Sequence, residues 1–96
     1  MSKFHETKNN NLAFHCLGCD MVHVVDSRWK FNNDFEKPTI HPSLLVRYTY
    51  RGECHVCHSF IEDGMMQYLS DCTHQLSGET VEIPDFEITH PDWNDL

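Results

Sequence analysis

The chain has 96 residues, of which 15 are acidic and 7 basic, and its formal net charge is −8. This length allows one domain with a single core. Binding to nucleic-acid phosphates needs a basic surface, so the composition argues against direct nucleic-acid binding. No apolar run approaches the roughly 20 residues of a membrane-spanning helix, and we therefore expect no membrane segment.

The two ends of the chain give further expectations. Residues 1–6 show no basic segment followed by an apolar run, so we expect no signal peptide and a reducing, cytoplasmic location. From Glu79 onward the chain holds acidic residues but no lysine or arginine. We expect a single domain over residues 1–96, with an ordered core over about residues 12–85 and an acidic C-terminal tail over residues 86–96.

Short segments of β-forming residues alternate with turn residues along the chain, which predicts a mostly β fold without a helix. The predicted strands, in chain order, cover residues 12–16, 21–26, 28–31, 44–51, 58–61, 65–69 and 80–83. The first two form a zinc-ribbon-like hairpin. The strands at 58–61 and 65–69 form a second hairpin, because Asp63-Gly64 between β-formers is a strong turn signal.

Two segments are predicted to be irregular. Residues 1–11 are polar and rich in asparagine, and residues 35–43 contain Pro38 and Pro42, which disfavour a regular ladder and predict an extended connector. In so small a domain the large aromatic residues are expected in the core. These residues are Trp29, Phe31, Phe60 and Tyr68. The fold class is a small antiparallel β domain with a zinc-ribbon-like knuckle and irregular loops.

The cysteines carry the clearest chemical signal. Two pairs have the spacing of metal ligands, Cys16 with Cys19 and Cys54 with Cys57. Reduced thiols in a chain with eight histidines are more readily metal ligands than disulfides. The register of the second hairpin places Cys72 opposite the neighbourhood of Cys54, so three thiols gather at one end of it. A bound metal would also stabilise a core that is too small to do so alone.

We expect the metal to be Zn²⁺, because zinc prefers four tetrahedral ligands drawn from thiolate and imidazole. Cys16, Cys19 and Cys57 are the expected ligands among the thiols. The fourth ligand remains open among four residues: His74, Cys54, Cys72 and His23. Since His58 follows Cys57 directly in a predicted strand, its side chain points to the opposite face, and it serves something other than the same zinc site.

Two blocks, Cys57-His58-Ser59-Phe60 and Asp71-Cys72-Thr73-His74, carry a resemblance, together with the turn from Cys16 to Cys19 and the segments at residues 29–32 and 38–43. The chain resembles a family of small, uncharacterised phage and prophage proteins that are often mislabelled as ammonia monooxygenases. The resemblance covers roughly residues 13–85. It implies a phage origin and, for a phage-encoded protein, a location in the host cytosol, but no particular reaction.

The motif set that the resemblance implies bears on the fourth ligand. The family pattern keeps His58, Asp71 and His74 beside the three expected thiol ligands, and a histidine at His23 is common. The resemblance therefore favours His74 as the fourth ligand, with Cys54 second on spacing.

Two functional hypotheses follow, and a third is weaker. The first is a small zinc-binding protein of phage type that has no catalytic residues and acts by binding a host or phage protein. The alternative is a small metal-dependent hydrolase or nucleic-acid-modifying enzyme that uses His58, Asp71 and His74 to move protons. The third is mimicry of a nucleic acid by the acidic tail. The number of protein ligands on the metal separates the first two, because a closed set of four leaves no position for a reactive water.

Overall fold

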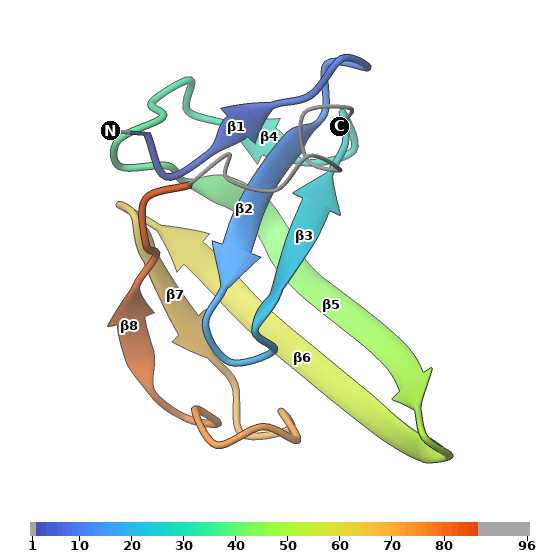
Figure 1. Ribbon diagram of the computed structural model, residues 1–96. Coiled ribbons are helices and arrows are strands. Elements are labelled where there is room, and N and C mark those ends of the chain that lie inside the picture. Colours follow the sequence, from blue (N-terminus) through green and yellow to red (C-terminus); the bar gives the residue numbers. More distant parts are fainter. Residues whose placement is uncertain (1, 87–96) are drawn as a thin grey trace.

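The computed structural model describes residues 2–86, and it is an antiparallel β structure throughout this range (Figure 1). The strands are β1 (His5–Glu6), β2 (Leu12–Cys16), β3 (Met21–Val25), β4 (Lys30–Phe31), β5 (Ile40–Tyr50), β6 (Glu53–Glu62), β7 (Met65–Tyr68) and β8 (Thr80–Glu82). These residues include no helix, and so none that could cross a membrane. The expected mostly β fold class is confirmed.

The strands form two sheets. Strands β1, β2 and β3 make a three-stranded sheet, and strands β4 to β8 make a five-stranded sheet in sequence order. In Figure 1 the hairpin of β2 and β3 lies across the five-stranded sheet. The buried core draws on both sheets and on the segments beside them, and its members include Phe4, Phe14, Cys16, Val25, Ile40, Leu44, Cys57, Ile61, Met66, Tyr68 and Ile83.

Both long hairpins of the five-stranded sheet close with two-residue turns. Arg51 and Gly52 connect β5 to β6, and Asp63 and Gly64 connect β6 to β7. All four residues have positive φ, between 52° and 79°, as the type I′ turn of a twisted hairpin requires. The predicted Asp-Gly turn is thus confirmed, and it fixes which side chains of β6 and β7 share a face.

The pairing of β5 with β6 is interrupted near the start of β5. Ile40 pairs with Ile61 and Leu44 pairs with Ser59, so three residues, 41–43, lie opposite the single residue Phe60. The sequence predicted that residues 35–43 are a connector outside the sheet. That boundary is wrong, because β5 begins at Ile40 and accommodates Pro42 in a bulge, where no ladder hydrogen bond from proline is needed.

Other expectations also differ from the structure. The first eleven residues are not wholly irregular, because β1 pairs with β2, and β6 begins at Glu53, before the predicted start of its strand. Phe60 is not a core residue, since 41% of it is exposed on the outer face of the sheet, whereas Tyr68 is buried. The predicted acidic tail, residues 86–96, lies outside the described residues except for Phe86.

Candidate functional site

Three thiols and one imidazole converge where the β2–β3 hairpin meets β6. Cys16 ends β2, Cys19 lies in the following turn, His23 is on β3 and Cys57 is on β6. Their ligand atoms all lie within 4.8 Å of one another. The sulfurs of Cys16 and Cys57, 41 residues apart in the sequence, are 3.8 Å apart. This group could hold a metal ion.

The ligand atoms fit a metal ion that prefers thiolate ligands in tetrahedral geometry, such as Zn²⁺. With zinc–sulfur bonds of about 2.3 Å, two thiolates of one tetrahedral ion lie about 3.8 Å apart, which is the separation of Cys16 and Cys57. Nε2 of His23 is buried and has no hydrogen-bond partner, as expected for a nitrogen that is a metal ligand. The turn between Cys16 and Cys19 brings backbone to the same sulfur, because the N–H of Cys19 points to the Cys16 sulfur at 3.5 Å.

The close approach of the thiols also perturbs their ionisation. Hydrogen bonds from Cys19 and Cys57 hold the pKa of Cys16 well below its usual range. Hydrogen bonding to Cys16 raises the pKa of Cys19 to about 11 and raises that of Cys57 as well. A lowered thiol pKa favours the thiolate form, which is the form that binds a metal ion.

His74 belongs to a second, overlapping group with Cys57 and Cys72, whose ligand atoms also lie within 4.8 Å of one another. Nδ1 of His74 accepts a hydrogen bond from the backbone N–H of Leu76 at 3.2 Å. A neutral ring that accepts at Nδ1 carries its proton on Nε2, and a protonated nitrogen has no lone pair for a metal. Nε2 is buried without a partner, so this N–H is directed into the thiol region.

The ring of His74 also explains the glycine of the turn between Cys16 and Cys19. A Cβ on Gly18 would lie only 2.4–2.7 Å from three atoms of the His74 ring. Tyr68 contacts the edge of the same ring, with centroids 4.5 Å apart, and its hydroxyl accepts the Gly18 N–H at 3.1 Å. Burial, aided by its hydrogen bond to Cys16, raises the pKa of Tyr68, so the phenol stays protonated.

A different set of groups meets on the other face of β6. The His58 ring lies between Ser43 and Asp71: Nε2 is 3.1 Å from the Ser43 hydroxyl oxygen and Nδ1 is 3.1 Å from a carboxylate oxygen of Asp71. The side chain of His58 is 25% exposed and that of Asp71 is 56% exposed, so the site is open to solvent. This is the connectivity of a serine nucleophile, its base and the carboxylate that orients the base.

Three segments position this set. Ser43 stands at the end of the bulge in β5, and the indole N–H of Trp29 donates to its carbonyl at 3.4 Å. The segment that carries Asp71 is fixed along β6 by its neighbour Cys72, whose sulfur contacts both the N–H and the carbonyl of His58 at 3.2 Å. Ser43, His58 and Asp71 therefore all lie in segments that are fixed by contacts to the backbone.

The structure separates the residues that the sequence singled out. Cys16, Cys19 and Cys57 lie together with His23, while His74 joins the overlapping second group. Cys54 is exposed, pairs across from Thr49 and lies in neither group. Cys72 was expected opposite the neighbourhood of Cys54; in the structure the backbone N–H of its neighbour Thr73 bonds to the Val56 carbonyl, and the Cys72 thiol lies with Cys57 and His74.

Sequence reasoning assigned roles to His58 and Asp71 but missed Ser43 completely. Serine is common, and Ser43 lies 15 residues from His58, in a proline-containing segment predicted to be a connector. One sequence signal pointed to this second site: His58 was expected to face away from the thiols and to serve another purpose. That expectation is supported by the opposite placement of Cys57 and His58 in the structure.

The fold and the site together define a small all-β domain that carries a hydrogen-bonded Ser–His–Asp set on one face of a strand and a thiol–imidazole cluster on the other. The chain belongs to the BubE family, described as bacterial ubiquitination-like system serine protease, whose family model matches residues 2–69. The match includes Ser43 and His58 and ends before Asp71. No curated protein and no solved structure matches the chain.

Proposed function

We propose that this protein is a serine protease in which Ser43 is the nucleophile, His58 the general base and Asp71 the residue that orients His58. The observation that carries the proposal is the position of His58, with one ring nitrogen 3.1 Å from the Ser43 hydroxyl and the other 3.1 Å from Asp71. Membership of a family described as serine proteases supports it independently, through a match that spans both Ser43 and His58.

The geometry supports acyl transfer in two half-reactions. The Ser43 oxygen attacks the carbonyl carbon of a peptide bond, and its proton passes to Nε2 of His58. Asp71 accepts the Nδ1–H of His58 and stabilises the imidazolium that forms. His58 then returns the proton to the leaving amine, and the C–N bond breaks. Water hydrolyses the acyl-enzyme by the same proton transfers in the second half-reaction.

The thiol cluster has a structural role in this proposal. Cys16, Cys19, Cys57 and His23 would hold Zn²⁺ through four protein ligands, a closed set that is typical of structural sites. Such a set leaves no position for a reactive water, which disfavours a hydrolase that uses a metal-bound water. The ion would instead join the β2–β3 hairpin to β6, next to the residue that carries the base.

The family description also suggests the substrate and the setting. We propose that the substrate is a polypeptide of a ubiquitination-like system, since the family is described as serine proteases of such a system. The partner protein expected from the sequence is then the substrate. A phage or prophage origin is compatible with this proposal and is supported only by the sequence resemblance.

The proposal is tested with a fluorophosphonate probe, which reports an activated serine without requiring the natural substrate. The Ser43 oxygen displaces fluoride from phosphorus while His58 takes the proton. We expect labelling of the wild-type protein, none in Ser43→Ala or His58→Ala, and a rate about 10²-fold lower in Asp71→Asn.

Ser27→Ala is the matched control, because Ser27 is an exposed serine that is not a partner of the His58 ring. It should label at the wild-type rate. A wild-type labelling rate in Ser43→Ala or in His58→Ala would refute the assignment.

A further inference from the structure

The face of the sheet that carries His58 also carries a pocket of about 350 Å³. Its lining residues come from β6, β7, β8 and the β6–β7 turn: Phe60, Glu62, Asp63, Met65, Gln67 and Thr80. His58, Phe60 and Glu62 alternate along β6, so their side chains share the outer face of the sheet. The pocket is therefore on the face from which a substrate reaches the catalytic set.

Phe60 joins the pocket to the nucleophile. It is the single residue of β6 that lies opposite the bulge ending at Ser43. Phe60 is also two residues from His58 on the same face of β6, so this wall of the pocket lies along the strand from the ring that contacts the Ser43 hydroxyl. The exposed fraction of Phe60, 41%, makes its ring available to a ligand.

The chemistry of the lining combines an apolar wall with an acidic rim. Phe60 and Met65 supply apolar surface, Glu62 and Asp63 supply carboxylates, and none of the six lining residues is basic. Within residues 2–86, neither Glu62 nor Asp63 forms an ion pair. Both carboxylates are thus available to a cationic ligand.

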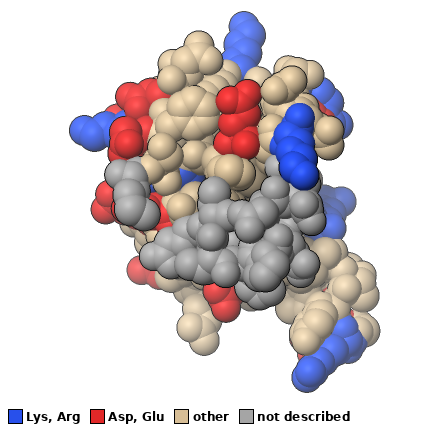
Figure 2. Space-filling model, turned by 45° about the horizontal axis from the view of Figure 1, so that its top comes forward, with Lys and Arg blue, Asp and Glu red and all other residues tan. Residues whose placement is uncertain are grey.

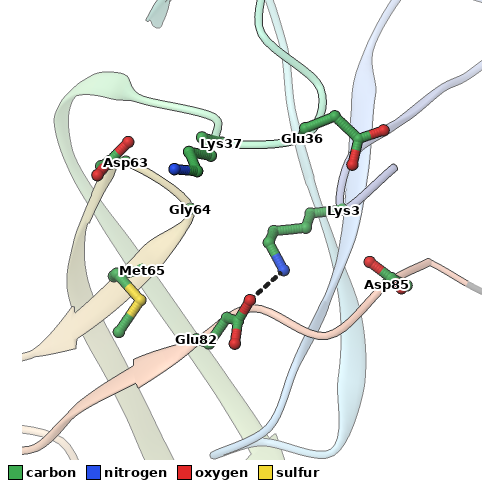
Figure 3. Close-up of a pocket in the computed structure, with 8 residues that line it drawn as sticks. All are labelled: Lys3, Glu36, Lys37, Asp63, Gly64, Met65, Glu82 and Asp85. Atoms are coloured by element: carbon green, nitrogen blue, oxygen red, sulfur yellow. Dashed lines mark hydrogen bonds and ion pairs between the residues drawn. The ribbon is translucent and has the colours of Figure 1, made fainter. Parts of the chain in front are cut away.

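The neighbouring pocket of about 570 Å³ shows why Glu62 is the more important carboxylate (Figure 3). Asp63 lines both pockets, and in the second it shares the lining with Lys37, whose charge lowers the attraction of Asp63 for another cation. Lys3 in the same pocket is already engaged, donating to Glu82 at 2.9 Å and to the carbonyl of Ile83 at 2.7 Å. Glu62 lines the first pocket and does not line this second one.

We propose that this pocket selects a lysine or arginine side chain of the substrate, at the residue whose carbonyl carbon Ser43 attacks. The aliphatic stem would pack on Phe60 and Met65, and the cationic head would reach Glu62. The inference rests on the proposed function, because it requires Ser43 to be the nucleophile. It goes beyond the family description, which names a protease but no residue preference.

A matched pair of covalent probes tests the preference. The probes are two peptidyl diphenyl phosphonates that differ only at the residue next to phosphorus, which is a lysine analogue in one and a norleucine analogue in the other. Ser43 displaces phenoxide from phosphorus in both, so the ratio of labelling rates isolates the ammonium group. We expect the lysine probe to label about two- to fivefold faster, the range for a partly exposed ion pair.

Variants assign the preference to the pocket. Glu62→Gln should bring the ratio of rates close to one, Glu62→Lys should favour the norleucine probe, and Phe60→Ala should slow both probes because both stems lose the same contact. Glu53→Gln removes another exposed carboxylate, at the far end of β6, and should leave the ratio unchanged.

The outcomes separate this inference from the proposed function. Equal rates for the two probes, or a preference that survives Glu62→Gln, would overturn the inference while leaving Ser43 as the nucleophile. Failure of both probes to label a protein that the simple fluorophosphonate labels at Ser43 would also overturn it. Failure of all three reagents would instead remove the proposed function, and the inference with it.

Discussion

Single residues set the chemistry on both faces of β6. Cys57 directs its thiol into the buried cluster, and the next residue, His58, directs its ring to Ser43 and Asp71. Because adjacent strand residues alternate in direction, one strand carries both a candidate metal ligand and the proposed catalytic base, and their side chains lie on opposite faces. The rings of His23 and His74 also differ, because a given ring nitrogen of histidine can offer either a lone pair or an N–H.

His23 and His74 should therefore respond differently to removal. We expect His23→Ala to lose bound zinc, whereas His74→Ala should keep about one ion per chain, because His74 directs an N–H rather than a lone pair toward the thiols. The zinc content of each variant after dialysis, measured by plasma mass spectrometry, tests this difference. Cys54→Ser is the control and should retain zinc. Zinc lost from His74→Ala but kept by His23→Ala would favour the ligand set that the resemblance implies.

Gly18 should tolerate no side chain while His74 is present. Its Cβ would meet the ring at 2.4–2.7 Å, and overpacking of this kind costs about 1–3 kcal/mol. Chemical denaturation should show this loss for Gly18→Ala and its partial recovery in the double variant with His74→Ala. Gly78→Ala is the comparison, since only its φ of 79° opposes a side chain. Additive effects of the two changes would contradict a direct contact.

The sequence predicts a site residue when its partners lie close to it in the chain, and not when strand pairing brings them together. The thiols at Cys16 and Cys19 are a local pair whose spacing predicts candidate ligands, although the same spacing does not bring Cys54 into the cluster. His23 and Ser43 carry no such signal, because their roles depend on which strands pair and where β5 bulges. Phe60 was misjudged for a related reason: its size favours burial, but register places it outside the core.

At the scale of elements, the sequence predicts strands better than it predicts the sheet edges and the first segment. Regular alternation and the Asp63-Gly64 turn fix most of the strands. The N-terminal segment lacks such a pattern, yet it is held by long-range bonds: Lys3 bonds through its backbone to Phe35 and through its side chain to Glu82 and Ile83. These bonds connect the start of the chain to β8, which no local pattern indicates.

The ion pair between Lys3 and Glu82 gives a stability prediction with a defined sign. The hydrogen bond from Lys3 lowers the pKa of Glu82, so the pair stabilises the fold above the unfolded-state pKa of about 4.3 and is lost as the pH falls through the lower folded-state pKa. Urea unfolding should show that the difference between wild type and Glu82→Gln shrinks in acid. A difference that grows in acid would contradict this.

Lys3→Met should cost more than loss of the ion pair alone. The lysine side chain is only 11% exposed and also donates to the Ile83 carbonyl, so its removal leaves a carbonyl without its partner. We expect a loss of about 1–2 kcal/mol in the free energy of unfolding at neutral pH. Lys30→Met, at an exposed lysine of β4, should have little effect. Equal losses for the two variants would argue against the Lys3 contacts.

At the scale of the whole molecule, the thiol cluster and the proposed catalytic set of Ser43, His58 and Asp71 lie on opposite faces of β6. The cluster joins the three-stranded sheet to the five-stranded sheet, and the catalytic set depends on the position of β6 within the latter. On the face shown in Figure 2, basic side chains stand apart from one another among acidic and uncharged ones. That face offers no continuous basic surface among its described residues.

Metal removal should therefore affect both stability and labelling. Structural zinc contributes on the order of 10–16 kcal/mol to small zinc-binding peptides, so a strong chelator should unfold or loosen this domain and abolish reaction with fluorophosphonate. Circular dichroism and labelling of the same samples test this, and re-addition of Zn²⁺ should restore both. An unchanged thermal midpoint after verified metal removal would contradict the structural role.

The most direct test of the account is to locate the fluorophosphonate adduct by tandem mass spectrometry of the digested, labelled protein. We expect one adduct, on the hydroxyl of Ser43, because only this serine within residues 2–86 is hydrogen-bonded to a histidine that also contacts a carboxylate. An adduct on any other residue, or a folded and metal-loaded protein that forms none, would contradict it.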